Sequence, residues 1–497
     1  MRELLLGIDI GTSACKVAVF DTSGNVITSL NGKYHAIHTQ DGWAEQNPED
    51  WWNAVIACIR EILTDGNIKA SEISAIGIDG ISWAAVAMDN QGECLCNTPL
   101  WFDTRSQEIC DELNRNLGRE NIFSISGNPM KPGYTTPKVL WYKKFMPEIY
   151  SRINKILQCN GYIAFKLTGE YSQDLSQGYG WHCFDMRTGK WDDRMISEMQ
   201  LNKNFLPEIV ACDKVIGCVS HVAAIQTGLC EGTPVVAGGL DAACGTLGAG
   251  VIHDGETQEQ GGQAGGMSIC TNECVSDERL ILSFHVIPNK WLLQGGTTGG
   301  GGVIRWFSEN FATDFSEINN LAAKIPAGCD GLVFLPYMMG ERTPIWDPNA
   351  KGVFYGIDFA KSKAHFVRAC MEGVALALRH NLTVAEEAGA KIHDLRSMGG
   401  SANSLLWTQI KSDVTNRKIF VPSSDTATTL GAAMLAGVGV GIYRDYDEAV
   451  SKTVRITREH EPNFENYAMY NKTYETYIKL YESLKNLMQK SGGKLSA

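Results

Sequence analysis

Hydrophobic and polar residues alternate at the start of the chain in the pattern of a β-strand. Residues 4–10 place aliphatic side chains at every even position on one face, while Asp9 and then Gly11 fall on the other. A second apolar run follows at 16–20, and a turn sequence at 21–25 leads into a third run. We therefore expect a β-hairpin or meander. Rossmann and Walker phosphate loops are disfavoured, because each would open a helix after the glycine.

Later segments carry the periodicity and the end signals of helices. At 47–50 a capping asparagine, a proline and two acids predict a helix start. Ser362 predicts the cap of a long helix that stops before Gly389. Near the C-terminus, aromatic and apolar residues recur at spacings of three and four: Tyr467, Tyr470, Tyr474, Tyr477, Tyr481 and Leu484. This stripe predicts a terminal helix packed on its own domain rather than a coiled coil.

A strand, a glycine break and a helix occur in that order in both halves of the chain. Strand 233–237 leads through two glycines into a helix of small residues that begins at Asp241, and 397–403 repeats this break. The strand pattern starts again soon after the first helix. We therefore expect an α/β protein with two domains, 1–253 and 254–497, which suits a chain of 497 residues.

Composition and charge narrow the class of protein. The formal net charge is −12 and no stretch is rich in lysine and arginine, which argues against nucleic-acid binding. No apolar run is long enough to span a bilayer, and the N-terminus lacks the layout of a signal peptide. The 15 cysteines are scattered without a Cys-x-x-Cys motif, which favours thiols in a reducing compartment over zinc or disulfides. We expect a soluble, cytoplasmic protein.

The first strand ends in residues that suit magnesium and phosphate. A carboxylate inside a strand is costly to bury unless a cation or hydrogen-bond donors meet it, and Asp9 stands beside Gly11, Thr12 and Ser13. Magnesium takes one or two carboxylates together with water and phosphate oxygens, and a glycine lets backbone N–H groups approach a phosphate. The alternative is a strand end in which Asp9 only bonds its own turn.

Asp241 and two glycine-rich stretches are further candidates. Asp241 stands at a predicted helix N-terminus, where the helix dipole favours the ionised carboxylate. Most aspartates in that position are simple caps, but close glycine packing favours an open position that faces a ligand. The stretches 261–266 and 295–302 either cradle phosphate through main-chain donors or make ordinary turns.

Two segments are candidates for binding a sugar. Ser82 and Trp83 form a polar and aromatic break between strands, where Trp83 either stacks on a sugar ring or anchors the core. Asp103 and Arg105 point to one side of an extended segment. There they either bind hydroxyl groups or form a salt bridge that holds the loop.

Motifs spread over nearly the whole chain resemble those of the FGGY family of carbohydrate kinases. The matching segments are 138–141, 334–337, 340–344, 352–357, 365–366 and 369–372. The first of these is the looser match, and Cys370 departs slightly from the usual residue in the last. The segment 334–344 looks most like the xylulose kinases of this family.

The resemblance implies an α/β fold of two actin-like (ribonuclease H-like) ATPase domains with a catalytic cleft between them. It implies that residues 1–253 bind the sugar and carry the catalytic aspartate, and that residues 254–497 bind the nucleotide. The implied cofactors are ATP and Mg²⁺. The implied partners are a small-molecule sugar and ATP, without nucleic acid or membrane, and a homodimer is the assembly considered.

The resemblance also implies roles for individual residues. Asp241 corresponds to the catalytic base, for which an ordinary pKa suffices because a loose transition state needs little prior deprotonation. Asp9 would orient the magnesium ion. The sugar would contact Ser82, Trp83, Asp103, Arg105 and Asp241. ATP would contact Gly11, Thr12, Ser13, Lys16, Gly262, Gln263, Gly299, Gly300, Gly399, Gly400 and Asn403.

Two segments depart from the pattern of the family. The second phosphate hairpin usually reads Gly-Thr-Ser-Gly, but residues 262–265 read Gly-Gln-Ala-Gly, so both hydroxyls are lost. The substrate loop of xylulose kinases usually reads Gly-Gln-Met-His, but residues 80–83 read Gly-Ile-Ser-Trp. An indole therefore replaces a histidine that would bond a sugar hydroxyl, and such a loss can change selectivity strongly.

The expected activity is ATP-dependent phosphorylation of a sugar hydroxyl, with D-xylulose to D-xylulose 5-phosphate as the first choice. Ribulose, fuculose, erythritol and glycerol are alternative acceptors, because the substrate loop is altered. An actin-like protein that hydrolyses ATP while regulating a partner is the alternative from another class.

Overall fold

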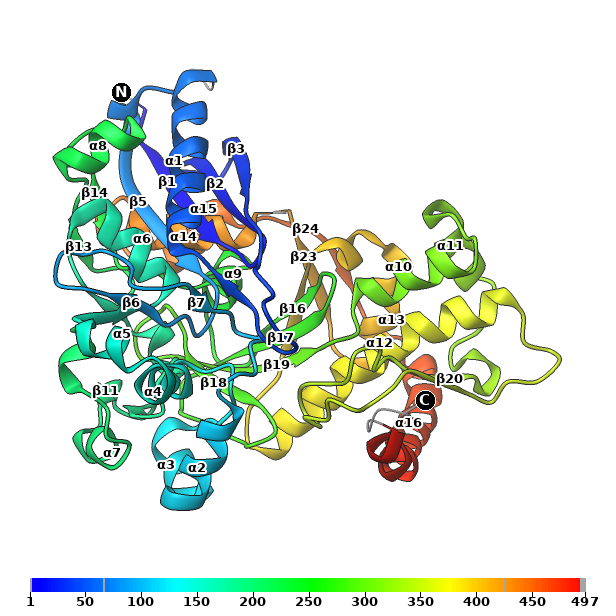
Figure 1. The fold of residues 1–497 in the computed structure, drawn as a ribbon. Coiled ribbons are helices and arrows are strands. Elements are labelled where there is room, and N and C mark those ends of the chain that lie inside the picture. The colour runs from blue at the N-terminus through cyan, green and yellow to red at the C-terminus, as the bar shows by residue number, and fades with distance from the viewer. Residues whose placement is uncertain (1, 66–67, 424–425, 492–497) are drawn as a thin grey trace.

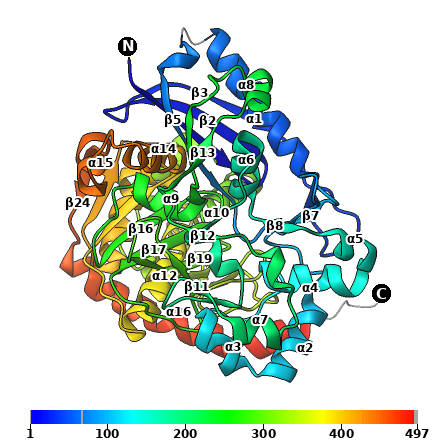
Figure 2. The same cartoon turned by 90° about the vertical axis from the view of Figure 1, so that its left-hand side faces the viewer.

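The computed structural model describes residues 2–65, 68–423 and 426–491, which form two large sheets with helices packed on them (Figures 1 and 2). The first sheet has the order β13–β14–β5–β1–β2–β3, and β15 (Gly239–Leu240) pairs with the end of β5. Its other strands are β1 (Leu4–Ile10), β2 (Ala14–Asp21), β3 (Val26–Lys33), β5 (Ile73–Gly80), β13 (Val215–Cys218) and β14 (Pro234–Val236).

The second sheet repeats this topology. Its order is β18–β19–β17–β16–β22–β23–β24. In both sheets the first strand pairs antiparallel with the second and parallel with a later strand, β5 or β22. The strands are β16 (Glu256–Gly261), β17 (Gly265–Thr271), β18 (Ile281–Phe284), β19 (Trp291–Thr297), β22 (Asp394–Met398), β23 (Ile419–Pro422) and β24 (Ile456–His460). The repeat agrees with the expected pair of similar α/β domains.

The N-terminal hairpin follows the predicted alternation. β1 and β2 pair in register from Leu4 opposite Asp21 to Ile10 opposite Cys15. The even-numbered aliphatic residues of β1 belong to one buried cluster with Trp51 and Trp52 of α1. The opposite face of β1 carries Leu5, which lies in a second cluster. The prediction of a meander without a following helix is confirmed.

Helices account for most of the remaining chain. In the first half they are α1 (Pro48–Asp65), α2 (Gln107–Leu117), α3 (Arg119–Ser126), α4 (Thr135–Phe145), α5 (Pro147–Arg152), α6 (Cys159–Thr168), α7 (Asp193–Glu198), α8 (His221–Thr227) and α9 (Asp241–Gly248). In the second half they are α10 (Gly301–Asn310), α11 (Phe315–Ala322), α12 (Lys363–Glu387), α13 (Leu405–Thr415), α14 (Ala427–Gly439), α15 (Tyr446–Thr453) and α16 (Phe464–Ser491). In the described parts of the chain, no helix has the length and apolar character needed to cross a bilayer.

Smaller strand pairs complete the fold. They are β4 (Glu45–Gln46) with β7 (Thr98–Pro99), β6 (Val86–Met88) with β8 (Lys155–Leu157), β9 (Gln173–Asp174) with β12 (Ile209–Val210), β10 (Phe184–Asp185) with β11 (Lys190–Trp191), and β20 (Val333–Leu335) with β21 (Val353–Tyr355). The terminal helix α16 packs on its own half, as predicted. Its Tyr470, Tyr477 and Tyr481 are buried in a cluster that also holds residues of α12, α13 and β20.

One helix of the second half packs against the first sheet. α14 contacts β1, β5 and α9. A Cβ atom on Gly77 of β5 would lie 1.8 Å from the carbonyl oxygen of Ala432, and one on Gly7 would lie 2.1 Å from that of Thr429. Because these positions have no side chain, the helix backbone rests directly on the sheet. The domain boundary at 253–254 therefore stays a prediction, since α14, which follows it in the chain, packs on the sheet of the first half.

We expect Gly77→Ala to destabilise the protein by at least about 2 kcal/mol, because the added methyl group would overlap the backbone of α14. Urea unfolding followed by circular dichroism would measure this loss. Gly245→Ala in α9 is the matched control, since its Cβ would meet the side chains of Thr428 and Gln258 at ordinary contact distances of 3.4 and 3.5 Å. An equal effect of both substitutions would contradict the close packing of α14 on β5.

Candidate active site

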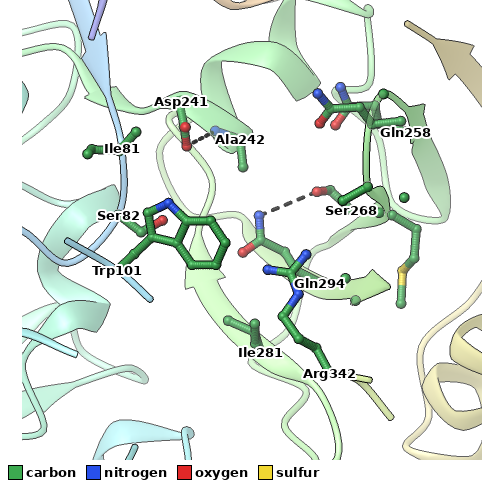
Figure 3. Close-up of a pocket in the computed structure, with 18 of the residues that line it drawn as sticks. Ile81, Ser82, Trp101, Asp241, Ala242, Gln258, Ser268, Ile281, Gln294 and Arg342 are labelled. Atoms are coloured by element: carbon green, nitrogen blue, oxygen red, sulfur yellow. Dashed lines mark hydrogen bonds between the residues drawn. The ribbon is translucent and has the colours of Figure 1, made fainter. Parts of the chain in front are cut away.

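Three cavities share wall residues: two are lined by both halves of the chain, and the third by the second half alone. The first has a volume of about 350 Å³ and is drawn in Figure 3. The first half lines it with Thr12, Ser82, Trp83, Trp101, Tyr179 and Asp241, and the second half with Gln258, Gln263, Gln294 and Arg342, among others. This cavity therefore has aromatic walls on one side and amides and a guanidinium on the other.

The second and third cavities adjoin the first. The second, about 490 Å³, is lined by Asp9, Lys16, Asp241, Gln258, Gly399, Gly400, Asn403 and Thr428, among others. The third, also about 490 Å³, has an apolar wall of Ile304, Phe315, Ile318, Met371 and Trp407. It shares Gly262 and Gln263 with the first cavity and Gly400 and Asn403 with the second.

Asp241 lies on the wall that the first and second cavities share. It is the first residue of α9, and one carboxylate oxygen accepts a hydrogen bond of 2.6 Å from the backbone N–H of Ala242. The strand before it is held by Ser176, whose hydroxyl accepts a hydrogen bond of 2.8 Å from the backbone N–H of Leu240. The prediction of a helix that begins at Asp241 is confirmed.

The pKa of Asp241 differs from the ordinary value expected from the sequence. Burial raises it to about 7, and the negative charge of Asp9 adds to the rise. The hydrogen bond from Ala242 acts in the opposite direction but is weaker. The favourable effect of the helix N-terminus is therefore outweighed by desolvation and by a like charge, neither of which the local sequence reveals.

Asp9 faces the second cavity from the end of β1. Its Oδ2 accepts a hydrogen bond of 2.7 Å from the hydroxyl of Thr428, just inside α14. Lys16 pairs with it across the hairpin, and Asp79 of β5 pairs with it on the other side. A carboxylate, a neighbouring lysine and an open cavity suit a magnesium ion bound together with phosphate oxygens. Asp9 is thus the residue that fits such an ion.

Asp79 is a buried carboxyl group that the sequence did not single out. Its two oxygens meet no hydrogen-bond donor among the described residues. Burial raises its pKa well above the ordinary value, and the charges of Asp9 and Asp241 raise it further. Burial beside two other carboxyl groups therefore favours the protonated form of Asp79.

Some of the predicted nucleotide-binding residues line the cavities, and others lie behind or beside the cavity walls. Thr12, Gly262, Gln263, Gly399, Gly400 and Asn403 line the cavities, as does Lys16. Gly299 and Gly300 do not line any of the three cavities. They pack behind the hairpin instead: a Cβ on Gly300 would lie 2.4 Å from the backbone of Ala264. Gly11 and Ser13 flank Thr12 but are not on the cavity walls.

Trp83 packs in the core and also lines a cavity, so its stacking on a sugar ring stays a prediction. It lines the first cavity, yet it is only 9% exposed and its ring stacks on Tyr134 with 4.0 Å between the ring centroids. Its backbone has a positive φ of 62°, and its carbonyl oxygen accepts a hydrogen bond of 2.8 Å from Lys138. Burial lowers the pKa of Lys138 to about 7. The loop 80–83 is therefore held in an unusual conformation by a buried lysine.

Asp103 and Arg105 do not reach the cavities. Arg105 bonds Asp103 at 2.9 Å and Glu45 at 2.8 Å, and its guanidinium lies 4.0 Å from the ring centroid of Trp43. Asp103 also accepts a hydrogen bond of 2.7 Å from the backbone of Ala44. The salt bridge that holds the loop, rather than hydroxyl binding, is what the structure contains. The residue of this segment that faces the first cavity is Trp101.

Comparison with known proteins identifies the family of this chain. Residues 4–248 match the N-terminal domain, and residues 266–440 the C-terminal domain, of the FGGY family of carbohydrate kinases. The chain belongs to this family. It is 30% identical to the xylulose kinase of Bacillus subtilis (strain 168), with 98% of each chain covered. The gluconokinase of Bacillus licheniformis is 28% identical over 98% of this chain and 97% of its own.

The fold agrees with that of solved FGGY kinases. The ligand-bound xylulose kinase from Lactobacillus acidophilus superposes with a TM-score of 0.92 at 26% identity, covering 98% of this chain and 99% of that one. The expected actin-like pair of α/β domains is thereby confirmed. Similar relatives named for different sugars leave the acceptor of this FGGY kinase open.

Several cavity residues were not predicted from the sequence of this FGGY kinase. Arg342 stands inside the matching segment 340–344 and Trp101 lies two residues before Asp103, so a signal for both existed. Tyr179, Gln294 and Thr428 had none, because they enter the cavities through contacts between segments far apart in the chain.

A buried ion pair links the elements around the third cavity. Lys411 of α13 is 1% exposed on its side chain, and its ammonium lies 2.6 Å from Glu259 of β16 and 2.7 Å from the hydroxyl of Ser401. Glu259 stands in the strand that leads to Gly262, and Ser401 in the turn after Gly400. Lys411 therefore positions both glycine turns relative to each other.

We expect Lys411→Met to weaken ATP binding about tenfold, because the two turns lose their shared link and a buried carboxylate loses its partner. Titration calorimetry with ATP would measure the dissociation constant, after circular dichroism has shown that the variant is folded. Lys418→Met, which removes a surface lysine of the same half, is the matched control. An unchanged ATP affinity in Lys411→Met would contradict the positioning role.

The raised pKa of Asp241 makes the stability of the FGGY kinase depend on pH. Since the folded pKa is about 7, the stabilising contribution of protonated Asp241 is lost as the pH rises from about 4 through 7. Relative to Asp241→Asn, the parent should lose about 2 kcal/mol of unfolding free energy between about pH 5 and about pH 8. The expected loss of about 2 kcal/mol is smaller than the full shift in the pKa of Asp241 would give, because the Asp241 side chain stays partly exposed to the cavity.

Urea unfolding of both proteins without nucleotide at the two pH values would measure this difference. Asp111→Asn, an exposed carboxylate of α2, controls for general charge effects. A difference between the parent and Asp241→Asn that does not change with pH would show that the pKa of Asp241 is ordinary.

Proposed function

We propose that this FGGY kinase transfers the γ-phosphoryl group of ATP to a sugar hydroxyl, with D-xylulose, giving D-xylulose 5-phosphate, as the leading acceptor. The observation that carries the proposal is the position of Asp241 on the wall shared by the first and second cavities. A sugar in the first cavity and a triphosphate in the second would meet at this carboxylate. The apolar third cavity suits a nucleobase.

In the proposed mechanism Asp241 accepts the proton of the acceptor hydroxyl as its oxygen attacks the γ-phosphorus and ADP leaves. The hydrogen bond from Ala242 orients the carboxylate. The hydroxyl of Thr428 orients Asp9 toward the second cavity. Magnesium bound with ATP would supply neutralisation of phosphate charge. Backbone N–H groups at Thr12 and in the 262–265 hairpin line the first cavity and would hold the γ-phosphate oxygens where the two cavities meet. Most of the acceleration would then come from positioning.

Other acceptors remain within the proposal. Ribulose, fuculose, erythritol and glycerol are candidates because Ser82 and Trp83 replace the usual substrate loop. A protein that hydrolyses ATP while regulating a partner would turn over ATP equally with and without any sugar. Sugar-dependent turnover therefore separates the kinase from that alternative.

We expect Asp241→Ala to reduce sugar-dependent ADP formation to below about one hundredth of the parent rate, because proton transfer and orientation are both lost. A coupled ADP assay at saturating ATP, over a panel of ketoses and polyols, measures this rate. ATP affinity should be largely kept.

Asp111→Ala on the surface of α2 is the control for Asp241→Ala. Retention of more than about a tenth of the parent rate would remove Asp241 from the role of base. ADP formation by the parent that no sugar stimulates would instead favour the ATPase that regulates a partner.

A further inference from the structure

Arg342 presents to the first cavity a guanidinium whose N–H groups have no hydrogen-bond acceptor among the described residues. Among the described residues it has no salt bridge and no side-chain hydrogen bond. The adjacent carboxylate, Glu341, makes no ion pair with this guanidinium: its Oε1 accepts hydrogen bonds of 2.7 Å from the backbone N–H groups of Thr298 and Arg342, and its buried Oε2 has no hydrogen-bond partner among the described residues. Burial lowers the pKa of Arg342 below its usual range and raises that of Glu341 to about 7. The cavity thus contains donors that need an acceptor.

The position of this guanidinium is built into the fold. It lies over the backbone of β19, where a Cβ on Gly296 would come within 2.5 Å of it. The next residue, Thr343, anchors the loop: its hydroxyl accepts a hydrogen bond of 2.6 Å from the N–H of Gly296 and donates one of 2.7 Å to Asn381. Across the cavity, the ring of Trp101 lies 5.4 Å from the guanidinium carbon. These contacts therefore fix the position of the Arg342 guanidinium at the cavity wall.

Arg342 and Asp241 line the same cavity from different ends (Figure 3). Asp241 also borders the second cavity, where the triphosphate would lie, whereas Arg342 borders only the first. An acceptor whose reacting hydroxyl meets Asp241 would direct its other end toward Arg342. Gln294, beside Arg342 in Figure 3, adds an amide to this end of the cavity.

A guanidinium can only donate hydrogen bonds, and it binds planar oxygen acceptors best. We propose that Arg342 is a specificity-determining residue that binds an sp² oxygen at the end of the acceptor remote from the phosphorylated hydroxyl. This inference rests on the proposed function. It assigns the acceptor to the oxo-sugars and sugar acids, whose ketone or carboxylate supplies such an oxygen, and disfavours alditols.

Matched acceptor pairs test this assignment. D-xylulose and xylitol differ only in the ketone, and D-gluconate and D-glucitol only in the carboxylate. For at least one pair we expect the parent to prefer the oxo member at least about tenfold in kcat/KM, because an alditol leaves the guanidinium without its acceptor. Preference in the first pair identifies a ketone as the bound group, and preference in the second identifies a carboxylate.

Variants separate recognition from packing. Arg342→Met should lower kcat/KM for the preferred oxo member at least about tenfold while changing its alditol less than about threefold. Arg342→Lys should restore part of the loss, since it keeps the charge but not the planar fork. Arg119→Met, at an exposed arginine of α3, is the matched control. An equal loss for both members of a pair would show that Arg342 only packs against Trp101, and would overturn the inference.

A binding measurement keeps the inference distinct from the proposed function. Acceptor binding without ATP can be followed by tryptophan fluorescence, because Trp83 and Trp101 line the cavity. If acceptors bind in an Arg342-dependent manner but none stimulates ADP formation, the proposed function fails and the inference stands. If alditols stimulate ADP formation as well as their oxo partners, the inference fails and the kinase stands. If no member of either pair binds, the inference is wrong.

Discussion

The site depends on direct backbone packing of α14 against β1, β5 and α9. Each contact is made at a glycine, where a Cβ would lie within about 2 Å of a carbonyl oxygen: Gly7, Gly77, Gly248 and Gly431. Helices and strands that approach this closely leave no room for side chains between them. As a result the start of α14 brings Thr428 onto Asp9, and the start of α9 sets Asp241 beside the same cavity.

This packing concentrates carboxyl groups in a small volume. Asp9, Asp79 and Asp241 all have raised pKa values, with burial as the largest cause in each case. Their mutual repulsion is a cost of folding that the described residues offset only in part, through Lys16 and the hydroxyl of Thr428. A cation bound with phosphate would relieve the same repulsion, so the arrangement is best satisfied when the proposed ligands are present.

Around the first cavity, rigidity comes from residues that do not line it. Lys138 holds the carbonyl of Trp83, and the ion pair of Asp103 with Arg105 holds the segment that presents Trp101. The indole of Trp101 donates a hydrogen bond of 3.1 Å to the hydroxyl of Thr12. This bond links Trp101, in the wall of the first cavity, to the turn between β1 and β2. Asp103, Arg105 and Lys138 thus support the cavity without lining it.

The sequence by itself determined the local elements and the family. Alternation predicted the N-terminal meander, end signals predicted the helices after Ser362 and at Asp241, and the motifs predicted the paired α/β domains. These features depend on neighbours in the chain, which is why periodicity and capping residues reveal them. Several residues that line the second cavity were also named from the sequence, because glycines and aspartates occur there in recognisable order.

The tertiary structure decided the features that depend on contacts between segments far apart in the chain. Only the folded chain brings α14 onto the first sheet, turns Asp103 and Arg105 toward Glu45 instead of the cavity, and buries Asp241 beside Asp9 so that its pKa rises. The same holds for Arg342, whose neighbours across the cavity come from the other half of the chain. Burial and charge proximity are properties of three-dimensional packing, so no local pattern of residues could have disclosed them.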